Sequence, residues 1–232
     1  YLGCMDSLAC NFNSDANTDD GLCVFAEQGY DCQGNITATV GDEIEGGYLF
    51  YIDEIAQRGL VASKEDVAGL YVWGCDGYNV PGANLTQIGS GLQNTLDIVA
   101  GCSETPIAAS VALAHESEGY TDWYLPSKDE LITMHYAGYA GSQGNIFEFE
   151  SMNYYSSSEQ SGTSVEAFGF INSYQHQYFY KTNEVKVRPI RAFGNWDEGC
   201  TDELAYNYNE NAYTDDGSCI LSTEFNGYDI FL

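Results

Sequence analysis

The sequence predicts an α+β protein with a sizeable central domain between two small, loop-rich acidic modules. Three observations predict this class. The chain has 232 residues with 44% hydrophobic content, enough for one large core. Helical and strand-like segments follow one another in separate groups along the middle of the chain. A cysteine-containing motif occurs at both ends. We place the domains at residues 1–36, 37–194 and 195–232.

The elements of the central domain follow from local patterns. Short runs rich in β-branched and aromatic residues predict strands, and apolar residues three or four positions apart predict helices. The expected strands cover residues 48–52, 59–63, 154–159, 166–172, 178–182 and 185–193. Two expected helices cover residues 91–100 and 106–114. Ser127 and Glu130 form a capping box, which predicts a third helix running toward Gly138.

The charge of the chain excludes several classes of function. Seven basic residues stand against 35 acidic ones, giving a net charge of −28. Such a chain cannot neutralise a phosphate backbone, so no nucleic-acid partner is expected, and an anionic membrane surface would repel it. No stretch approaches the ~20 apolar residues that span a bilayer, so membrane insertion is not expected.

The two ends of the chain are copies of one motif. Residues 3–23 and 199–219 align without a gap at an offset of 196, and 13 of their 21 positions are identical. Two cysteines recur in both copies, whereas Cys10 and Cys32 have tyrosines, Tyr206 and Tyr228, at the matching positions. Cysteines that are absent together are expected to be bonded together. The predicted disulfides are Cys4–Cys23, Cys200–Cys219, Cys10–Cys32 and, from the remaining cysteines, Cys75–Cys102.

Four disulfides predict folding in an oxidising compartment outside the cytoplasm. A zinc site is the alternative for these cysteines. The chain has no CxxC pair, and the neighbouring polar residues carry oxygen rather than sulfur or imidazole donors, which disfavours zinc.

Oxygen-bearing side chains alternate along both copies of the motif and end in paired acids. This spacing is typical of a short loop that wraps calcium, although it is not an EF-hand. Calcium is therefore the expected cofactor. The alternative is that the same side chains form Asx turns within a disulfide-closed loop. The candidate ligands are Asp6, Asn11, Asn13, Asp15, Asp19 and Asp20, with Asp202, Asn207, Asn209, Asn211, Asp215 and Asp216 in the second copy.

Aromatic side chains next to polar ones suggest a binding surface, because aromatic rings stack on sugars while polar groups bond the hydroxyls. Tyr120, Asp122 and Trp123 are one candidate, and Tyr178 lies in a second aromatic stretch. Core packing is the alternative for these aromatic residues. Lys186 and Arg188 alternate on one strand face and could hold an anionic glycan. Their alternative is pairing with the many carboxylates.

Several ordered motifs resemble a known family. GGYLFYIDE (46–54), VWGC (72–75), GYTDWYLPSKDEL (119–131), YYSSSE (154–159) and VRPIRAF (187–193) resemble the Lcl-type C-terminal domain of bacterial collagen-like adhesins and the fibrobacter major paralogous domains. These domains are similar to the C-type-lectin and formylglycine-generating-enzyme folds. The resemblance implies a secreted adhesion domain, often with glycan ligands, whose first and last strands pair so that its two ends emerge together.

The terminal motif resembles the acidic GCTDPxAxNYNxxAxxDDGSC modules of large surface proteins of marine and gliding bacteria, and more distantly the thrombospondin type 3 calcium repeats. The calcium-bridged sugar motifs of C-type lectins are absent, however, and no catalytic motif is present. Formylglycine chemistry needs reactive cysteines, whereas each cysteine here has an expected disulfide partner. We therefore expect no enzymatic activity.

These patterns together predict a segment of a bacterial surface fibre that acts outside the cell. Its expected task is adhesion, with a glycan or another surface protein as the partner, and self-association into a fibre or oligomer is expected as well. The apolar last residues (225–232) could link subunits, fold back on their own module or remain frayed. The alternative is a repeating filament subunit without a ligand of its own.

Overall fold

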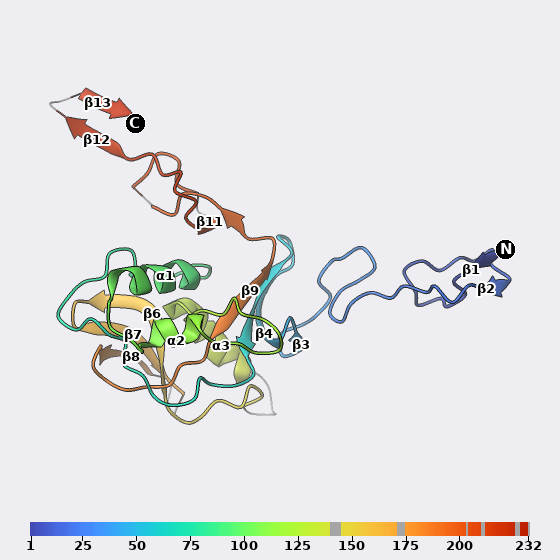
Figure 1. Cartoon of the computed structure of the whole chain (residues 1–232), viewed down its shortest axis with the longest axis horizontal. Helices are drawn as coiled ribbons and strands as arrows, with labels where there is room; N and C mark the ends of the chain where they lie inside the picture. The colour runs from blue at the N-terminus through green and yellow to red at the C-terminus, as the bar shows by residue number, and fades with distance from the viewer. Residues whose placement is uncertain (140–144, 171–174, 203, 210–211, 226–227, 232) are drawn as a thin grey trace.

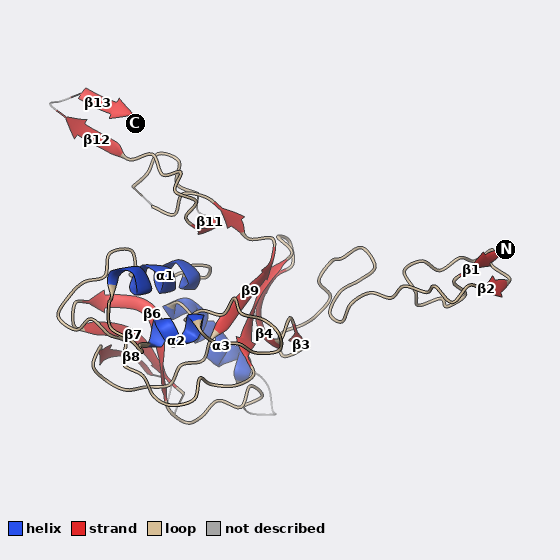
Figure 2. Ribbon diagram, viewed as in Figure 1, coloured by secondary structure: helices blue, strands red, loops and turns tan. Residues whose placement is uncertain are grey.

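A computed structural model describes residues 1–139, 145–170, 175–202, 204–209, 212–225 and 228–231. The middle of the chain forms a body of two sheets and three helices, from which two thin terminal segments project (Figure 1). Figure 2 shows that all three helices lie in this body. The mixture of helices and sheets confirms the predicted α+β class. None of the helices in the described ranges has the length and apolarity to cross a membrane.

The first sheet is antiparallel and has the strand order β3-β4-β5-β9. Its strands are β3 (Glu43–Ile44), β4 (Gly47–Asp53), β5 (Arg58–Ser63) and β9 (Ile190–Gly194). The expected strands at 48–52 and 59–63 are confirmed. The family resemblance predicted direct pairing of the first and last strands, which is wrong. A tight turn between Asp53 and Arg58 makes β5 the neighbour of β4, and β5 then pairs with β9 on its other edge.

The second sheet is an antiparallel meander in which β7 lies between β6 and β8. Its strands are β6 (Asn153–Ser161), β7 (Ser164–Gly169) and β8 (Gln175–Tyr180). The last expected strand, 185–193, is regular only from Ile190 onward. Its first part forms isolated bridges from Val185 to Tyr71 and from Lys186 to Tyr154. Pro189, which lacks an N–H, separates these bridges from β9.

The three helices are α1 (Gly91–Gly101), α2 (Ala108–Leu113) and α3 (Lys128–Gly138). The predicted capping box begins α3: the Glu130 N–H donates to Ser127 Oγ at 3.3 Å, and the Ser127 N–H donates to Glu130 Oε2 at 2.7 Å. Helix α3 packs Leu131 and Met134 beside β4 and β7. The cluster around Trp73 buries Ile98 of α1 and residues of α2.

Two buried ion pairs tie together segments of the body that are distant in sequence. The Lys181 ammonium is fully buried and bonds Glu159, while also donating to the Tyr78 carbonyl at 2.7 Å. The Arg188 guanidinium pairs with Asp66 at 2.5 Å and donates to the carbonyl oxygens of Ser63 and Phe147. A buried charge that loses its partner is strongly destabilising, so these pairs fix the arrangement of the strands they join.

The terminal modules share one fold, as the repeat predicts. In the first, β1 (Leu2–Gly3) pairs in parallel with β2 (Thr18–Asp19), and in the second, β10 (Asp197–Glu198) pairs in parallel with β11 (Ala212–Thr214). Loop hydrogen bonds also recur at the 196-residue offset: the Asn13 and Asn209 N–H groups donate to the Cys4 and Cys200 carbonyls, each at 2.9 Å. The structure contains the four predicted disulfides, Cys4–Cys23, Cys10–Cys32, Cys75–Cys102 and Cys200–Cys219.

The end of the chain forms a hairpin. Strand β12 (Ser222–Phe225) pairs with β13 (Tyr228–Phe231) in antiparallel register. This local pairing differs from the three fates expected for residues 225–232, which were linking subunits, folding back on the module and fraying. The hairpin lies at the far end of the C-terminal projection (Figure 1).

The two modules attach to the body differently. Tyr213 of the C-terminal module packs on the core cluster of α3, with its ring 4.8 Å from Trp196 and 6.0 Å from Tyr124. Residues 1–26 form an arm that extends away from the body (Figure 1). Tyr30 and Ile36, which precede the expected boundary after residue 36, pack on the body core together with Ala38. The Cys10–Cys32 disulfide ties the arm to this packed segment.

Two segments at the start and end of the body meet beside the turn between β4 and β5. The Ile36 N–H donates to the Gln57 side-chain oxygen at 2.6 Å, and the Asn195 N–H donates to the Gln57 carbonyl at 3.2 Å. Adjacent chain ends were expected from direct pairing of the first and last strands. The structure brings the ends together instead through Gln57, a residue in the left-handed region at φ 54°.

Candidate ligand-binding site

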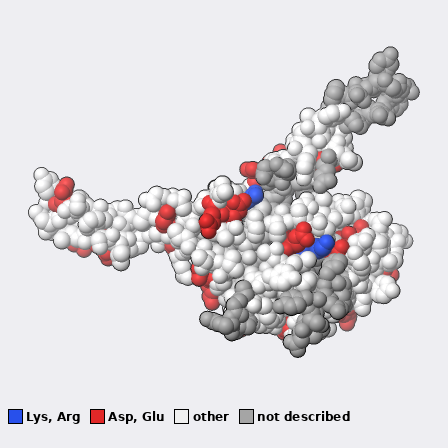
Figure 3. Space-filling view, turned by 180° about the vertical axis from the view of Figure 1, so that it is seen from behind, with Lys and Arg blue, Asp and Glu red and all other residues white. Residues whose placement is uncertain are grey.

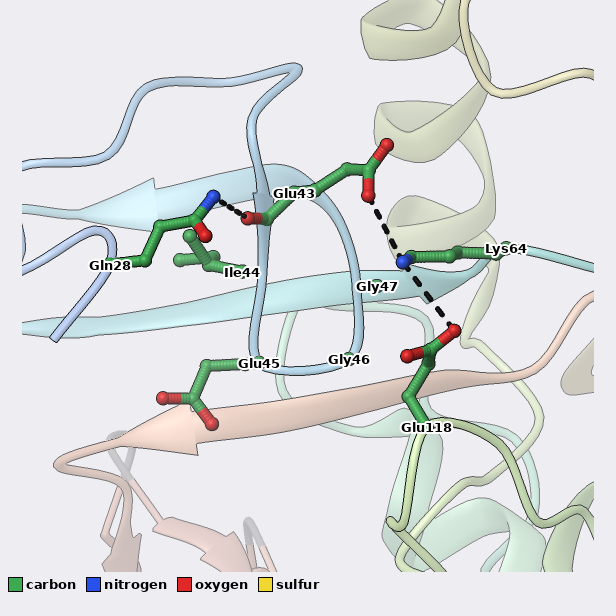
Figure 4. A pocket seen from close by; sticks show the side chains of 8 residues that line it. All are labelled: Gln28, Glu43, Ile44, Glu45, Gly46, Gly47, Lys64 and Glu118. Atoms are coloured by element: carbon green, nitrogen blue, oxygen red, sulfur yellow. Dashed lines mark hydrogen bonds and ion pairs between the residues drawn. The ribbon is translucent and has the colours of Figure 1, made fainter.

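A polar pocket of about 220 Å³ opens beside the start of β4. Carboxylates, one amine and one amide line it, together with backbone of the glycine pair (Figure 4). The lining residues are Gln28, Glu43, Ile44, Glu45, Gly46, Gly47, Lys64 and Glu118. They come from four parts of the chain, Gln28, residues 43–47, Lys64 and Glu118, so the pocket is a product of the tertiary fold.

Backbone conformation shapes the rim of the pocket. Glu45 and Gly46 are both in the left-handed region, at φ 51° and 78°, and form the tight turn between β3 and β4. A side chain at Gly46 would run into the Tyr120 ring, so only glycine fits there. Glu118 is also left-handed, at φ 54°, and presents its carboxylate from the opposite loop. Non-glycine residues in this region are uncommon and are often found at functional sites.

Lys64 is held between two carboxylates. Its ammonium lies 3.0 Å from Glu43 Oε2 and 3.5 Å from Glu118 Oε1 (Figure 4). The hydrogen bond to Glu43 is the main cause that raises the pKa of Lys64 above its ordinary value. Lys64 therefore stays charged and bridges β3 to the Glu118 loop.

Glu45 points to the other side of the same turn, where it is the centre of a hydrogen-bond network. The Tyr30 hydroxyl donates to Glu45 Oε1 at 2.6 Å, and the Tyr120 hydroxyl donates to Oε2 at 3.3 Å. Arg191 Nη1 donates to the Glu45 carbonyl at 2.9 Å and to Oε2 at 3.2 Å. Burial, together with the hydrogen bond to Glu45, raises the pKa of Tyr30, so its hydroxyl keeps its proton.

Arg191 of β9 joins this network to Asp122. Two parallel hydrogen bonds, at 2.8 and 2.9 Å, link the guanidinium to the Asp122 carboxylate, and the guanidinium carbon lies 3.8 Å from the centre of the Tyr120 ring. Such bidentate, stacked arginines are geometrically well defined. The network therefore holds Tyr120 and Glu45 rigidly at the edge of the pocket.

Two of the three residues of the first predicted aromatic site lie beside the pocket. Tyr120 and Asp122 belong to the network bordering the pocket, and the Asp122 side chain is about half exposed. Trp123 was predicted to contact a ligand, and this is wrong: its ring is fully buried in the cluster with Leu49 and Val61. The chain passes into the body at this point: Asp122 stays exposed, whereas Trp123 and the following Tyr124 are both fully buried.

Both residues of the predicted basic pair lie in ion pairs with carboxylates. Arg188 is buried in its ion pair with Asp66, and Lys186 pairs with Glu150 at 2.6 Å. The alternative reading, pairing with surplus carboxylates, is therefore confirmed, and the ligand role predicted for Arg188 is wrong. Tyr178 lies on β8 in the other sheet and is 60% exposed. It is not a lining residue of the pocket.

The predicted calcium ligands act as structural hydrogen-bond acceptors within their own loops. Backbone N–H groups two residues ahead donate to one side-chain oxygen of Asp6, Asn13, Asp19 and Asp20 at 2.9–3.1 Å. Asn11 instead clamps the loop, donating to the Leu22 carbonyl at 2.7 Å and accepting from the Val24 N–H at 2.8 Å. These are the Asx turns of the alternative reading. No bond is described for the Asp15 side chain.

The second module repeats these bonds. Asp202, Asp215 and Asp216 accept from the backbone two residues ahead, and Asn207 clamps Ser218 and Ile220. Asn209 donates its backbone N–H to the Cys200 carbonyl, and Asn211 lies outside the described residues. Within the described ranges, no three histidine, cysteine or carboxylate side chains converge in a way that would hold a metal ion. Turn geometry therefore accounts for the polar side chains that the two copies share. Calcium binding stays a prediction, and it would have to use the carboxylate oxygens that accept no turn hydrogen bond.

Comparison with known proteins identifies no family model that matches the chain and no matching curated protein. The pocket residues Glu43, Glu45, Lys64 and Glu118 were not predicted from the sequence. Their only local signal is the Gly46-Gly47 pair, which precedes the predicted strand at 48–52 and does not by itself indicate a binding site.

Proposed function

We propose that this protein is an extracellular binding segment of a bacterial surface fibre, and that the pocket beside β4 binds a polyhydroxylated ligand such as a glycan. In this proposal the body is an Lcl-type, lectin-like domain that serves adhesion. The observation that carries the proposal is the lining itself: three glutamates, a lysine and an amide at the rim of a rigid aromatic network. Carboxylates accept hydrogen bonds from sugar hydroxyls, and Lys64 and Gln28 can donate them.

The charge around the pocket favours a neutral glycan over a sulfated one. The pocket holds one amine against three carboxylates, and the whole chain carries −28. Figure 3 shows that the little basic surface on the face drawn lies against acidic atoms. An anionic polysaccharide would be repelled on approach, whereas a neutral one would not.

An extracellular location is supported by the covalent structure. All eight cysteines are in disulfides, which form and persist in oxidising compartments. Attachment to a cell surface is part of the proposal and rests on the resemblance of the terminal motif to modules of surface proteins.

A glycan array tests the proposal. Wild-type protein should bind one or more neutral glycans, and Glu118→Gln should weaken that binding about tenfold or more, because a charge-assisted hydrogen bond contributes roughly 1.5–3 kcal/mol. Glu104→Gln is the matched control, since Glu104 lies in the exposed loop between α1 and α2 and should leave binding unchanged. Wild-type protein that binds no glycan, or equal binding by both variants, would refute the site.

The alternative function is a repeating filament subunit with no ligand. It is favoured by the closeness of the two ends of the body, where Ile36 and Asn195 both bond Gln57, because modules that continue from adjacent ends would place the body to one side of a continuous fibre. Electron microscopy of purified protein distinguishes the two, because the filament alternative requires polymers in the absence of any glycan.

A further inference from the structure

A polar groove runs along the junction between the body and the C-terminal module. A hollow of about 570 Å³ lies between the module on one side and helix α1 with the loop before it on the other. A second hollow of about 300 Å³ continues along the same loop to the end of β6, and the two hollows share Pro81, Gly82 and Asn84. The first hollow is larger than the pocket beside β4 and lies within the ~300–1,000 Å³ typical of small-molecule sites.

The loop that shapes both hollows is anchored from two sides. The Glu159 N–H of β6 donates to the Ala83 carbonyl at 2.6 Å. The Asn94 side chain of α1 donates to the Leu85 carbonyl at 2.6 Å and accepts from the Leu85 N–H at 3.3 Å. These bonds hold the loop against the sheet and the helix, so the body wall of the groove is formed before any ligand arrives.

The module wall is held in place by contacts across the junction. The Asp215 N–H donates to Gln93 Oε1 at 3.0 Å, and Gln93 Nε2 donates to Asp97 Oδ1 at 3.2 Å. Strand β11 of the module contacts α1 (Figure 1), and Tyr213 of this strand packs on the body core. A ligand in the first hollow would therefore contact the body and the module at once.

The side chains that line the groove suit hydroxyl groups. Asn79, Asn84 and Gln160 are exposed, and an amide both donates and accepts hydrogen bonds, as a sugar hydroxyl does. Thr201 adds a hydroxyl, and carboxylates on both walls add acceptors. Leu204 is 85% exposed and offers an apolar contact for the face of a sugar ring. No lysine or arginine is among the described residues lining either hollow, so an anionic ligand would find no counter-charge.

We propose that this groove binds a neutral oligosaccharide chain, with successive sugar units in the two hollows. The shared loop makes the hollows neighbours, so a chain can fill both where a single sugar fills one. The groove shares no lining residue with the pocket beside β4, and the proposal stands whether or not that pocket binds a glycan. A chain that contacts both walls also stabilises the docked position of the module, because it binds only while the two walls are together.

Calorimetry of the full chain tests the proposal, with glucose, mannose, galactose, N-acetylglucosamine and their linear oligomers as probes. At least one series should bind, and its affinity should rise from the single sugar to the longer oligomers. Asn84→Ala removes the exposed amide common to both hollows and should weaken binding of the longest oligomer about fivefold or more. Gln33→Ala, at an exposed amide outside the groove, is the matched control. Added salt should leave binding unchanged, because a neutral ligand carries no charge to screen.

Hydrogen exchange gives a second readout that does not depend on weakening the site. The oligomer that binds best should slow exchange of the Asp215 N–H, which bonds Gln93 across the junction. Absence of binding by every probe, equal affinity for single sugars and chains, unchanged binding by Asn84→Ala, unchanged exchange at Asp215 or loss of binding in salt would overturn the proposal. Binding that Glu118→Gln abolishes and Asn84→Ala leaves intact would assign the glycan to the pocket beside β4 instead.

Discussion

His135 is an interior histidine whose surroundings resist protonation. It is buried on α3, with ring centroids of Tyr139, Phe168 and Phe170 between 4.6 and 4.8 Å away. Burial lowers the pKa of His135 from 6.5 to about 4. Between these pH values the unfolded chain binds the proton and the folded chain does not, so folding stability is complete above pH 6.5 and is lost as the pH falls toward 4.

Urea unfolding at pH 7 and pH 4 measures this contribution. Between pH 7 and pH 4, the free energy of unfolding of the wild-type protein should fall by on the order of 3 kcal/mol more than that of His135→Phe. Phenylalanine fills the site without a titrating group. Glu130 acts in the opposite direction, because burial raises its pKa to about 7 and its contribution is lost as the pH rises from 4.5. Both proteins contain Glu130, so the difference between their losses of unfolding free energy reports His135. Equal losses would show that His135 does not cause the pH dependence.

At the scale of elements, the C-terminal module docks on the body through Tyr213 of β11 and through the Asp215 N–H, which donates to Gln93 Oε1 at 3.0 Å. Tyr213 is buried against Tyr124 and lies near Glu130, whose carboxylate accepts the Gly89 N–H at 2.8 Å. The matching position in the N-terminal module is Asn17, which bonds only within the arm. A single difference between the copies thus contributes to one module being docked and the other projecting.

Removal of the Tyr213 ring should release the module. Tyr213→Ala should lower the opening free energy measured by hydrogen exchange at Gly89 by about 2 kcal/mol, because most of a large ring leaves the interface. Tyr206→Ala, at an exposed position of the same module, serves as the control. Unchanged exchange at Gly89 in the Tyr213 variant would show that the module is held by other contacts.

The acidic motif raises a separate question at this scale, whether its loops also bind calcium. Each turn uses one oxygen of the aspartates concerned, which leaves the other available. If calcium binds only the folded modules, thermal melting of the whole chain should shift to higher temperature with calcium than with chelator. An identical melting midpoint with calcium and with chelator would contradict calcium binding. The shared side chains would then serve only the Asx turns of a disulfide-closed loop.

The sequence predicts the local features of this molecule better than its assembly. The repeat predicts three of the four disulfides, since bonded cysteines are gained or lost together, and it leaves Cys75–Cys102 as the remaining pair. The Ser127–Glu130 box predicts the start of α3 because capping is a local interaction. The insertion of β5 between β4 and β9, the burial of Arg188 and the packing of residues 29–38 on the body were not predicted. They depend on contacts between distant segments, which periodicity and spacing do not encode.

In the whole molecule, the pocket lies close to the segment that joins the N-terminal arm to the body. Gln28 belongs to the segment that the Cys10–Cys32 disulfide ties to the arm, and it donates to the Glu43 carbonyl at the pocket at 3.0 Å. The proposed binding site therefore includes a residue from the junction between module and body. A ligand there would contact both parts.

Chemical labelling of Lys64 tests the proposed site most directly. Lys64 is the one lysine in the pocket lining, and its side chain is 29% exposed, so a lysine-reactive acylating reagent can reach it. We predict that a saturating neutral glycan chosen from the array slows acylation of Lys64, measured by mass spectrometry, while Lys128 at the start of α3 reacts at an unchanged rate. Equal labelling of Lys64 with and without bound glycan would contradict the account.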